Sequence, residues 1–215
     1  RRIVGIDAGF HGRTGLAGAA GDDQVARYFL SDRPEEFIKV AFNDLGAMRA
    51  ALQGSDVAGV LLETIPATCG FPLPDDDYLP GVRALCDEFG TLYIADEVQT
   101  GFARTGGKMF GIEHWGVQPD IITCAKGMAN GFPIGATIAR EEVADSLQGL
   151  TISTFGGNPV SCAASLANIR FIEENKIAEQ ATDKGKRVLE ALQNITPKRV
   201  TIGEIRCQGL MVGIE

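Results

Sequence analysis

The sequence predicts an α/β fold built on a mostly parallel sheet that is flanked by helices. Two observations carry this prediction. Short apolar runs alternate with segments of helical periodicity along the chain, and the connections between them are short. Residues 57–63 (Val-Ala-Gly-Val-Leu-Leu-Glu) form an almost continuous apolar run, which is typical of a strand that is buried on both faces of a parallel sheet.

The first part of the chain supplies two further strands and a helix. Residues 2–7 form a short apolar run that is expected to be a strand. Residues 15–23 are rich in Gly and Ala and are expected to be a loop. Residues 37–42 alternate like a strand, and the Asn-Asp pair that follows caps a helix that is predicted to run to about Gln53.

The middle of the chain continues this alternation. A loop rich in Pro and Gly over 66–74 precedes a helix over 78–89, in which apolar residues recur at helical spacing until Gly90 ends the element. Three more strands are expected, at residues 91–95, 120–124 and 134–139.

The last part of the chain is expected to be helical up to about Asn194 and to form strands after that. A helix is predicted over 140–148. Asn158-Pro159 reads as a cap followed by Pro in the first turn of a long helix to Asn175, and another helix should run from about Ile177 to Asn194. Residues 200–215 are predicted to form two strands around Gln208-Gly209.

The composition indicates a globular protein and argues against several functional classes. The chain has 215 residues, 45% of them hydrophobic and 22% charged, which is enough for one core. A net charge of −8 argues against a nucleic-acid partner. Five scattered cysteines suggest neither a disulfide framework nor a zinc site, and we expect a cytoplasmic protein. No apolar run approaches the roughly 20 residues of a membrane span, and no signal peptide is recognisable.

An acid and a lysine carry the strongest chemical signal. The apolar run at 93–98 contains Asp96-Glu97, and a carboxylate at the end of such a strand points into the crevice where α/β proteins bind ligands. Lys126 follows a second apolar run and lies between small residues, where desolvation could make its amine nucleophilic. A buried acid and a buried lysine suit pyridoxal phosphate (PLP). For two isolated residues, a structural Asp–Lys ion pair is the alternative.

The surrounding motifs point to a family. The segment from Leu92 to Arg140, with Phe10-His11-Gly12-Arg13-Thr14 before it and Ser153-Thr154-Phe155-Gly156-Gly157-Asn158-Pro159 after it, resembles class III PLP-dependent aminotransferases. Their members include the ornithine, 4-aminobutyrate and acetylornithine aminotransferases. The resemblance covers nearly the whole chain, with the motifs in family order.

This resemblance implies a fold and a domain division. It implies the large domain of a fold type I PLP transferase over residues 1–195, without its N-terminal part, and the beginning of a small C-terminal α+β domain over 196–215. Because members of this family are about twice as long, the chain is expected to be an internal portion of the enzyme, without the glycine- and serine-rich phosphate loop.

The resemblance also implies roles for residues around the cofactor. Lys126 would form the Schiff base and shuttle the proton, and Asp96 would bond the pyridine nitrogen. Val98 and Phe10 would cover the two faces of the ring, and Gln99 would reach the phenolic oxygen. Without the resemblance, Phe10 would be taken for a core residue. Glu97, which faces away from Asp96, is expected to be a structural carboxylate that bonds backbone or an arginine.

Three further residues receive weaker assignments. His11 is given a secondary role near the cofactor, although a lone loop histidine is more often structural. Arg13 resembles an arginine that binds the substrate carboxylate, and a surface arginine is the equal alternative. Thr154 would bind the cofactor phosphate of the partner subunit, which implies a homodimer with a shared active site. The alternative for Thr154 is a turn before the next helix.

The predicted function is transamination. An amino group would pass from an amino acid or ω-amine to a 2-oxo acid, by ping-pong chemistry through the Lys126 Schiff base. The alternatives are another PLP reaction on the same scaffold (racemase or epimerase, decarboxylase or phospho-lyase) or a non-catalytic fragment. One departure from the family concerns substrate choice: Thr68 stands where ornithine-type enzymes have a glutamate that pairs with an arginine.

Overall fold

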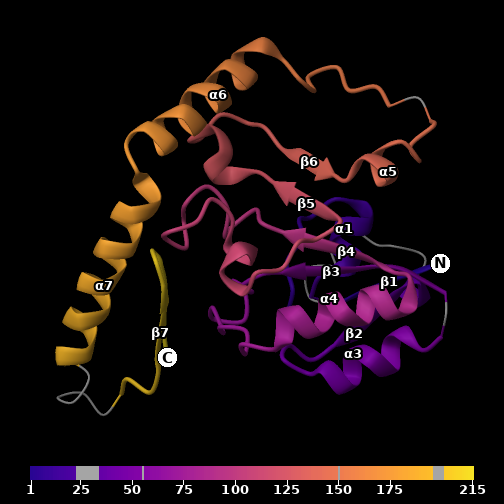
Figure 1. Cartoon of the computed structure of the whole chain (residues 1–215), viewed down its shortest axis with the longest axis horizontal. Coiled ribbons are helices and arrows are strands. Elements are labelled where there is room, and N and C mark those ends of the chain that lie inside the picture. The colour runs from indigo at the N-terminus through magenta and orange to yellow at the C-terminus, as the bar shows by residue number, and fades with distance from the viewer. Residues whose placement is uncertain (23–33, 55, 150, 196–200) are drawn as a thin grey trace. The chain divides into compact units, whose positions relative to one another are not determined.

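A computed structural model describes residues 1–22, 34–54, 56–149, 151–195 and 201–215. The chain divides into two compact units (Figure 1). The first unit comprises Arg1–Asp96 and Ile112–Pro119, and the second comprises Glu97–Gly111 and Asp120–Glu215. The domain division predicted from the sequence, 1–195 and 196–215, stays a prediction. Its boundary adjoins residues 196–200, which lie outside the described residues.

A four-stranded parallel arrangement forms the centre of the first unit, in the order β2-β1-β3-β4. The strands are β1 (Arg2–Ile6), β2 (Phe37–Val40), β3 (Val57–Glu63) and β4 (Leu92–Asp96). Strand β3 carries the continuous apolar run, and its side chains are mostly buried. Since all four strands run in the same direction, their carboxyl ends share one edge, where residues 7–11, Glu63 and Asp96 lie.

The helices of the first unit are α1 (Gly15–Ala20), α3 (Leu45–Leu52) and α4 (Tyr78–Phe89), with short 3-10 turns at η1 (Pro34–Glu36) and η2 (Gly111–Trp115). Helices α3 and α4 pack against each other (Figure 1). The Asp44 side chain caps α3 by accepting from Ala47 N at 2.7 Å, as the Asn-Asp pair predicts. Gly90 ends α4 in the left-handed conformation, with φ of 63°.

The second unit contains two antiparallel strand pairs and two long helices. Strands β5 (Ile121–Cys124) and β6 (Ala136–Ala139) form one pair, and β7 (Ile205–Gln208) and β8 (Met211–Ile214) form the other. The helices are η3 (Lys126–Ala129), α5 (Glu141–Ala144), α6 (Pro159–Glu174) and α7 (Ile177–Ile195). A methyl group on Gly185 of α7 would lie 2.0 Å from Gly209 O, so α7 packs directly on the β7–β8 turn.

The structure confirms the predicted α/β class with a mostly parallel sheet, and most predicted elements lie within two residues of their expected bounds. Two predictions were wrong. The loop expected at 15–23 contains α1, because its small residues Gly18, Ala19 and Ala20 are buried and pack closely: a Cβ on Gly5 would lie 2.9 Å from Ala20 O. Asp23 lies outside the described residues.

The helix expected over 140–148 is also shorter than predicted. Helix α5 covers only Glu141–Ala144. The hydroxyl of Ser146 donates to Val143 O at 2.7 Å, and such local side-chain bonds compete with helix propagation.

Among the described helices, none combines the length and the apolar character that crossing a membrane requires.

Candidate active site

Two carboxylates lie side by side at the carboxyl edge of the first unit's sheet. Glu63 ends β3, Asp96 ends β4, and the parallel register pairs these two residues directly. Both are buried, with exposed fractions of 3% for Glu63 and 6% for Asp96. Buried carboxylates need hydrogen-bond donors, and the segment that follows β1 supplies one donor for each of them.

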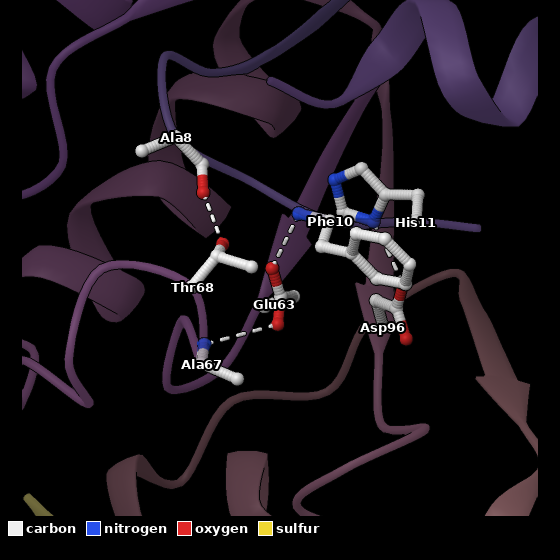
Figure 2. Close-up of polar contacts among 7 residues, drawn as sticks. All are labelled: Ala8, Phe10, His11, Glu63, Ala67, Thr68 and Asp96. Atoms are coloured by element: carbon white, nitrogen blue, oxygen red, sulfur yellow. Dashed lines mark hydrogen bonds and ion pairs between the residues drawn. The ribbon is translucent and has the colours of Figure 1, made fainter. Parts of the chain in front are cut away.

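His11 binds Asp96. Its Nδ1 lies 2.7 Å from Asp96 Oδ2, and both side chains are almost completely buried (Figure 2). Because an ionised carboxylate only accepts hydrogen bonds, Nδ1 carries the hydrogen. The other ring nitrogen, Nε2, is buried without a hydrogen-bond partner among the described residues. An unsatisfied buried polar atom costs about 1–3 kcal/mol, so this histidine sits where stability alone would not place it.

Glu63 binds two backbone N–H groups from different loops. Its Oε1 accepts from Phe10 N at 2.7 Å, and its Oε2 accepts from Ala67 N at 3.2 Å (Figure 2). Burial raises the pKa of Glu63, although these two N–H donors and the neighbouring His11 favour its ionised form. The Thr68 hydroxyl donates to Ala8 O, which joins the same two loops a second time.

Lys126 opens η3 in the second unit, immediately after Ala125 and strand β5. The residue is exposed, whereas the sequence predicts a buried lysine. Its φ is +38°. A non-glycine residue in the left-handed region costs about 1–3 kcal/mol, and such residues cluster at active sites.

One face of α6 holds the segment that follows Lys126. Asn168 Nδ2 donates to Gly127 O at 2.7 Å and to Met128 O at 3.2 Å. One turn earlier, Ser165 Oγ donates to Met128 O at 3.3 Å, and Ser161 Oγ donates to Pro133 O at 3.1 Å. Spacings of four and three residues place these side chains on the same helix face, so α6 fixes the backbone around the lysine.

Glu97 is a structural carboxylate, as predicted. It is completely buried, and its Oε2 accepts from Thr100 Oγ1 at 2.6 Å and from Gly111 N at 2.7 Å. Its backbone N–H donates to Thr123 O of β5 at 3.0 Å. The next two residues, Val98 and Gln99, are half-buried. Their predicted contacts with a cofactor ring and its phenolic oxygen stay predictions.

The remaining predicted site residues lie on exposed loops. Arg13 is exposed, three residues after the half-buried Phe10. Thr154 is exposed in the loop before α6, whose N-cap Asn158 accepts from Ser161 N at 2.9 Å. The structure therefore brings Phe10, His11 and Asp96 together in the first unit, whereas the ligand roles of Arg13 and Thr154 stay predictions.

The part that Glu63 plays in this arrangement was not predicted from the sequence. A signal for it exists in the sequence, because Glu63 ends a fully apolar strand and a buried carboxylate there requires donors. The identity of those donors could not be predicted, since they are backbone N–H groups of residues 53 and 4 positions away.

The chain was compared with known families and proteins. A model of the family described as aminotransferase class-III matches residues 1–215. Putrescine aminotransferase from Pectobacterium atrosepticum is 44% identical over 224 residues, covering 99% of this chain and 47% of that protein. Acetylornithine aminotransferase from Caldanaerobacter subterraneus is 41% identical over 215 residues, covering 100% of this chain and 54% of that protein.

Solved structures give the same result. A structure of the ornithine aminotransferase from Toxoplasma gondii, with PLP at partial occupancy in its active site, superposes with a TM-score of 0.93 at 32% identity. The match covers 100% of this chain and 51% of that one. The chain thus spans about half the length of the curated relatives it matches.

Proposed function

The chain belongs to the class III aminotransferase family, and we propose that it contributes the catalytic lysine and the cofactor-binding acid of a PLP-dependent transaminase. The proposed reaction moves an amino group from an amino acid or ω-amine to a 2-oxo acid. The observation that carries the proposal is the buried Asp96–His11 pair at the carboxyl edge of a parallel sheet, where α/β enzymes bind ligands.

The residues of the first unit fit PLP by their chemistry. When bound, PLP supplies an electron sink that stabilises negative charge on the substrate carbon next to the amino group. Asp96 offers a fixed, buried negative charge that would hold a proton at the ring nitrogen. His11 keeps one oxygen of that carboxylate in place through the 2.7 Å contact.

Lys126 would bind the cofactor carbonyl through Nζ and move the proton at the substrate carbon. An ordinary lysine has a pKa near 10.4 and is charged at neutral pH. A lysine acts as a nucleophile or base only in its neutral form, and desolvation by bound ligands favours that form. The hydrogen bonds that Asn168 of α6 donates to Gly127 O and Met128 O would hold the adjoining backbone while the lysine side chain moves.

The remaining site residues would contact the ring, the phosphate or the substrate. Phe10 and Val98 would cover the two ring faces, and Gln99 would bind the phenolic oxygen. Arg13 would bind the substrate carboxylate with its planar fork of donors. Thr154 would bind the cofactor phosphate of a partner subunit, so we propose a homodimer, acting in the cytoplasm.

Related enzymes named for putrescine, acetylornithine and ornithine suggest an amine of this kind as the donor. Thr68 limits the analogy with ornithine-type enzymes. It carries no charge, and its hydroxyl is bound to Ala8 O. It cannot form the carboxylate–arginine pair that the resemblance implies at this position in those enzymes.

A single-turnover experiment tests the proposed reaction. The protein loaded with PLP is given an amino donor without any 2-oxo acid. A transaminase releases one equivalent of carbonyl product per site and then stops until an acceptor is added. A racemase would interconvert enantiomers without stopping, and a decarboxylase would release carbon dioxide continuously; either outcome would replace the proposal.

A further inference from the structure

Glu63 and Asp96 pose a problem of like charges at the edge of the sheet. The register places the two carboxylates on neighbouring strands, and both are buried. Two consecutive residues of one short segment resolve this problem. The backbone N–H of Phe10 binds Glu63 at 2.7 Å, and the imidazole of His11 binds Asp96 at 2.7 Å (Figure 2). The contact of His11 with Asp96 therefore depends on where the Phe10 backbone is held.

Glu63 also closes a ring of hydrogen bonds between two loops. Phe10 N and Ala67 N donate to its two oxygens, and Thr68 Oγ1 returns from the second loop to Ala8 O on the first. The ring joins the loop that carries His11 to the end of β3 at two points. Cys69 Sγ adds a weaker contact with Ala8 O at 3.4 Å.

We propose that Glu63 is a positioning residue, which holds the Phe10-His11 segment so that the His11 imidazole stays bound to Asp96. This inference deepens the proposed function and rests on it, because Asp96 is the residue assigned to the cofactor nitrogen. Glu63 acts through His11 and requires no contact with cofactor or substrate. Thr68 shares the task from the other side of the ring.

The protein suits a direct test, since it has two histidines, His11 and His114. His114 is exposed in η2 and packs edge-on against Trp115, with ring centroids 6.1 Å apart. Labelling histidine with ¹⁵N therefore gives two imidazoles, one at the site and one as an internal reference. The chemical shifts of the ring nitrogens report which nitrogen carries the hydrogen.

The first variant is Glu63→Gln. Glutamine has one carbonyl oxygen and an amide N–H₂, so it can satisfy only one of the two backbone donors. We expect the Nδ1 and Nε2 shifts of His11 to change toward a mixture of tautomers, while those of His114 stay constant. Glu88→Gln is the matched control, because it makes the same change in an exposed carboxylate that binds Arg49.

A second pair of variants covers the case in which Glu63→Gln does not fold. Thr68→Val replaces the hydroxyl of an exposed side chain with a methyl group and should change the His11 shifts in the same direction, whereas Thr68→Ser keeps the hydroxyl and should give the wild-type shifts. Wild-type His11 shifts in folded Glu63→Gln, or in Thr68→Val if the first variant does not fold, overturn the proposal. Equal changes at both histidines overturn it too.

The readout needs no PLP, so it separates this inference from the proposed function. A protein that responds at His11 but fails to transfer an amino group would refute the transaminase assignment and leave the positioning role of Glu63 intact.

Discussion

At the scale of single residues, the site is governed by the cost of burying charge. Asp96 and Glu63 are buried carboxylates, and each receives a donor from the segment after β1. The sequence indicated Asp96 and Lys126 because each follows an apolar run. It could not indicate that Lys126 is exposed in a left-handed conformation, since that depends on the path of the backbone after β5.

Removing the charge of Asp96 should impair catalysis with little change in shape. Asp96→Asn would lose the charge-assisted contact proposed with the ring nitrogen, and such contacts contribute about 1.5–3 kcal/mol. We expect kcat/KM to fall by about 10- to 150-fold, as measured by steady-state kinetics with saturating PLP. Asp56→Asn changes an exposed aspartate that pairs with Arg2 and serves as the control. Equal kinetics for the two variants would remove Asp96 from the cofactor site.

Glu63 should make the free energy of unfolding depend on pH. Its folded-state pKa is raised by burial, so the folded protein holds this proton to a higher pH than the unfolded chain, where the pKa is about 4.3. The unfolding free energy of the wild type, relative to Glu63→Gln, should therefore fall as pH rises from about 4.3 through the folded-state value. Urea unfolding at several pH values measures this difference. If the unfolding free energy of the wild type, relative to Glu63→Gln, rises with pH, the pKa of Glu63 is not raised in the folded protein.

At the scale of elements, helix α6 is more than a cover for the second unit. Its Ser161, Ser165 and Asn168 bind backbone carbonyls of the segment after Lys126. The sequence predicted this helix well, because Asn158 and Pro159 mark its start by local chemistry. Its polar face could not be assigned a role from the sequence, since the carbonyls it binds lie 28 to 41 positions away.

Asn168→Ala tests the contribution of α6. The variant loses the donor to Gly127 O and Met128 O, and a hydrogen bond of this kind contributes about 0.5–1.5 kcal/mol. We expect that loss in urea unfolding, with faster amide hydrogen exchange in residues 126–130. Asn194→Ala, on an exposed position of α7, is the control. Unchanged exchange around Lys126 would show that α6 does not hold this segment.

At the scale of the whole chain, apolar periodicity and capping residues predicted the helices and strands whose bounds depend on neighbouring residues in the sequence. Strand β3 and helices α3 and α4 lie within two residues of their expected bounds, because apolar periodicity and caps define them. The two strands expected around Gln208-Gly209 are present as β7 and β8. Helix α1 was missed because its two glycines have weak helix propensity, which close packing of the segment against β1 outweighs. The contact of His11 with Asp96 joins residues 85 positions apart, which only the register of the sheet establishes.

We propose Lys126 as the catalytic lysine of a PLP enzyme. Borohydride reduction of the protein with PLP, followed by peptide mapping, tests it most directly. We expect one modified peptide, with pyridoxyl phosphate on Lys126. The substitution Lys126→Ala should abolish it, and Lys108→Ala, an exposed control, should retain it. A modified peptide centred on another lysine, or no modified peptide at all, would contradict it.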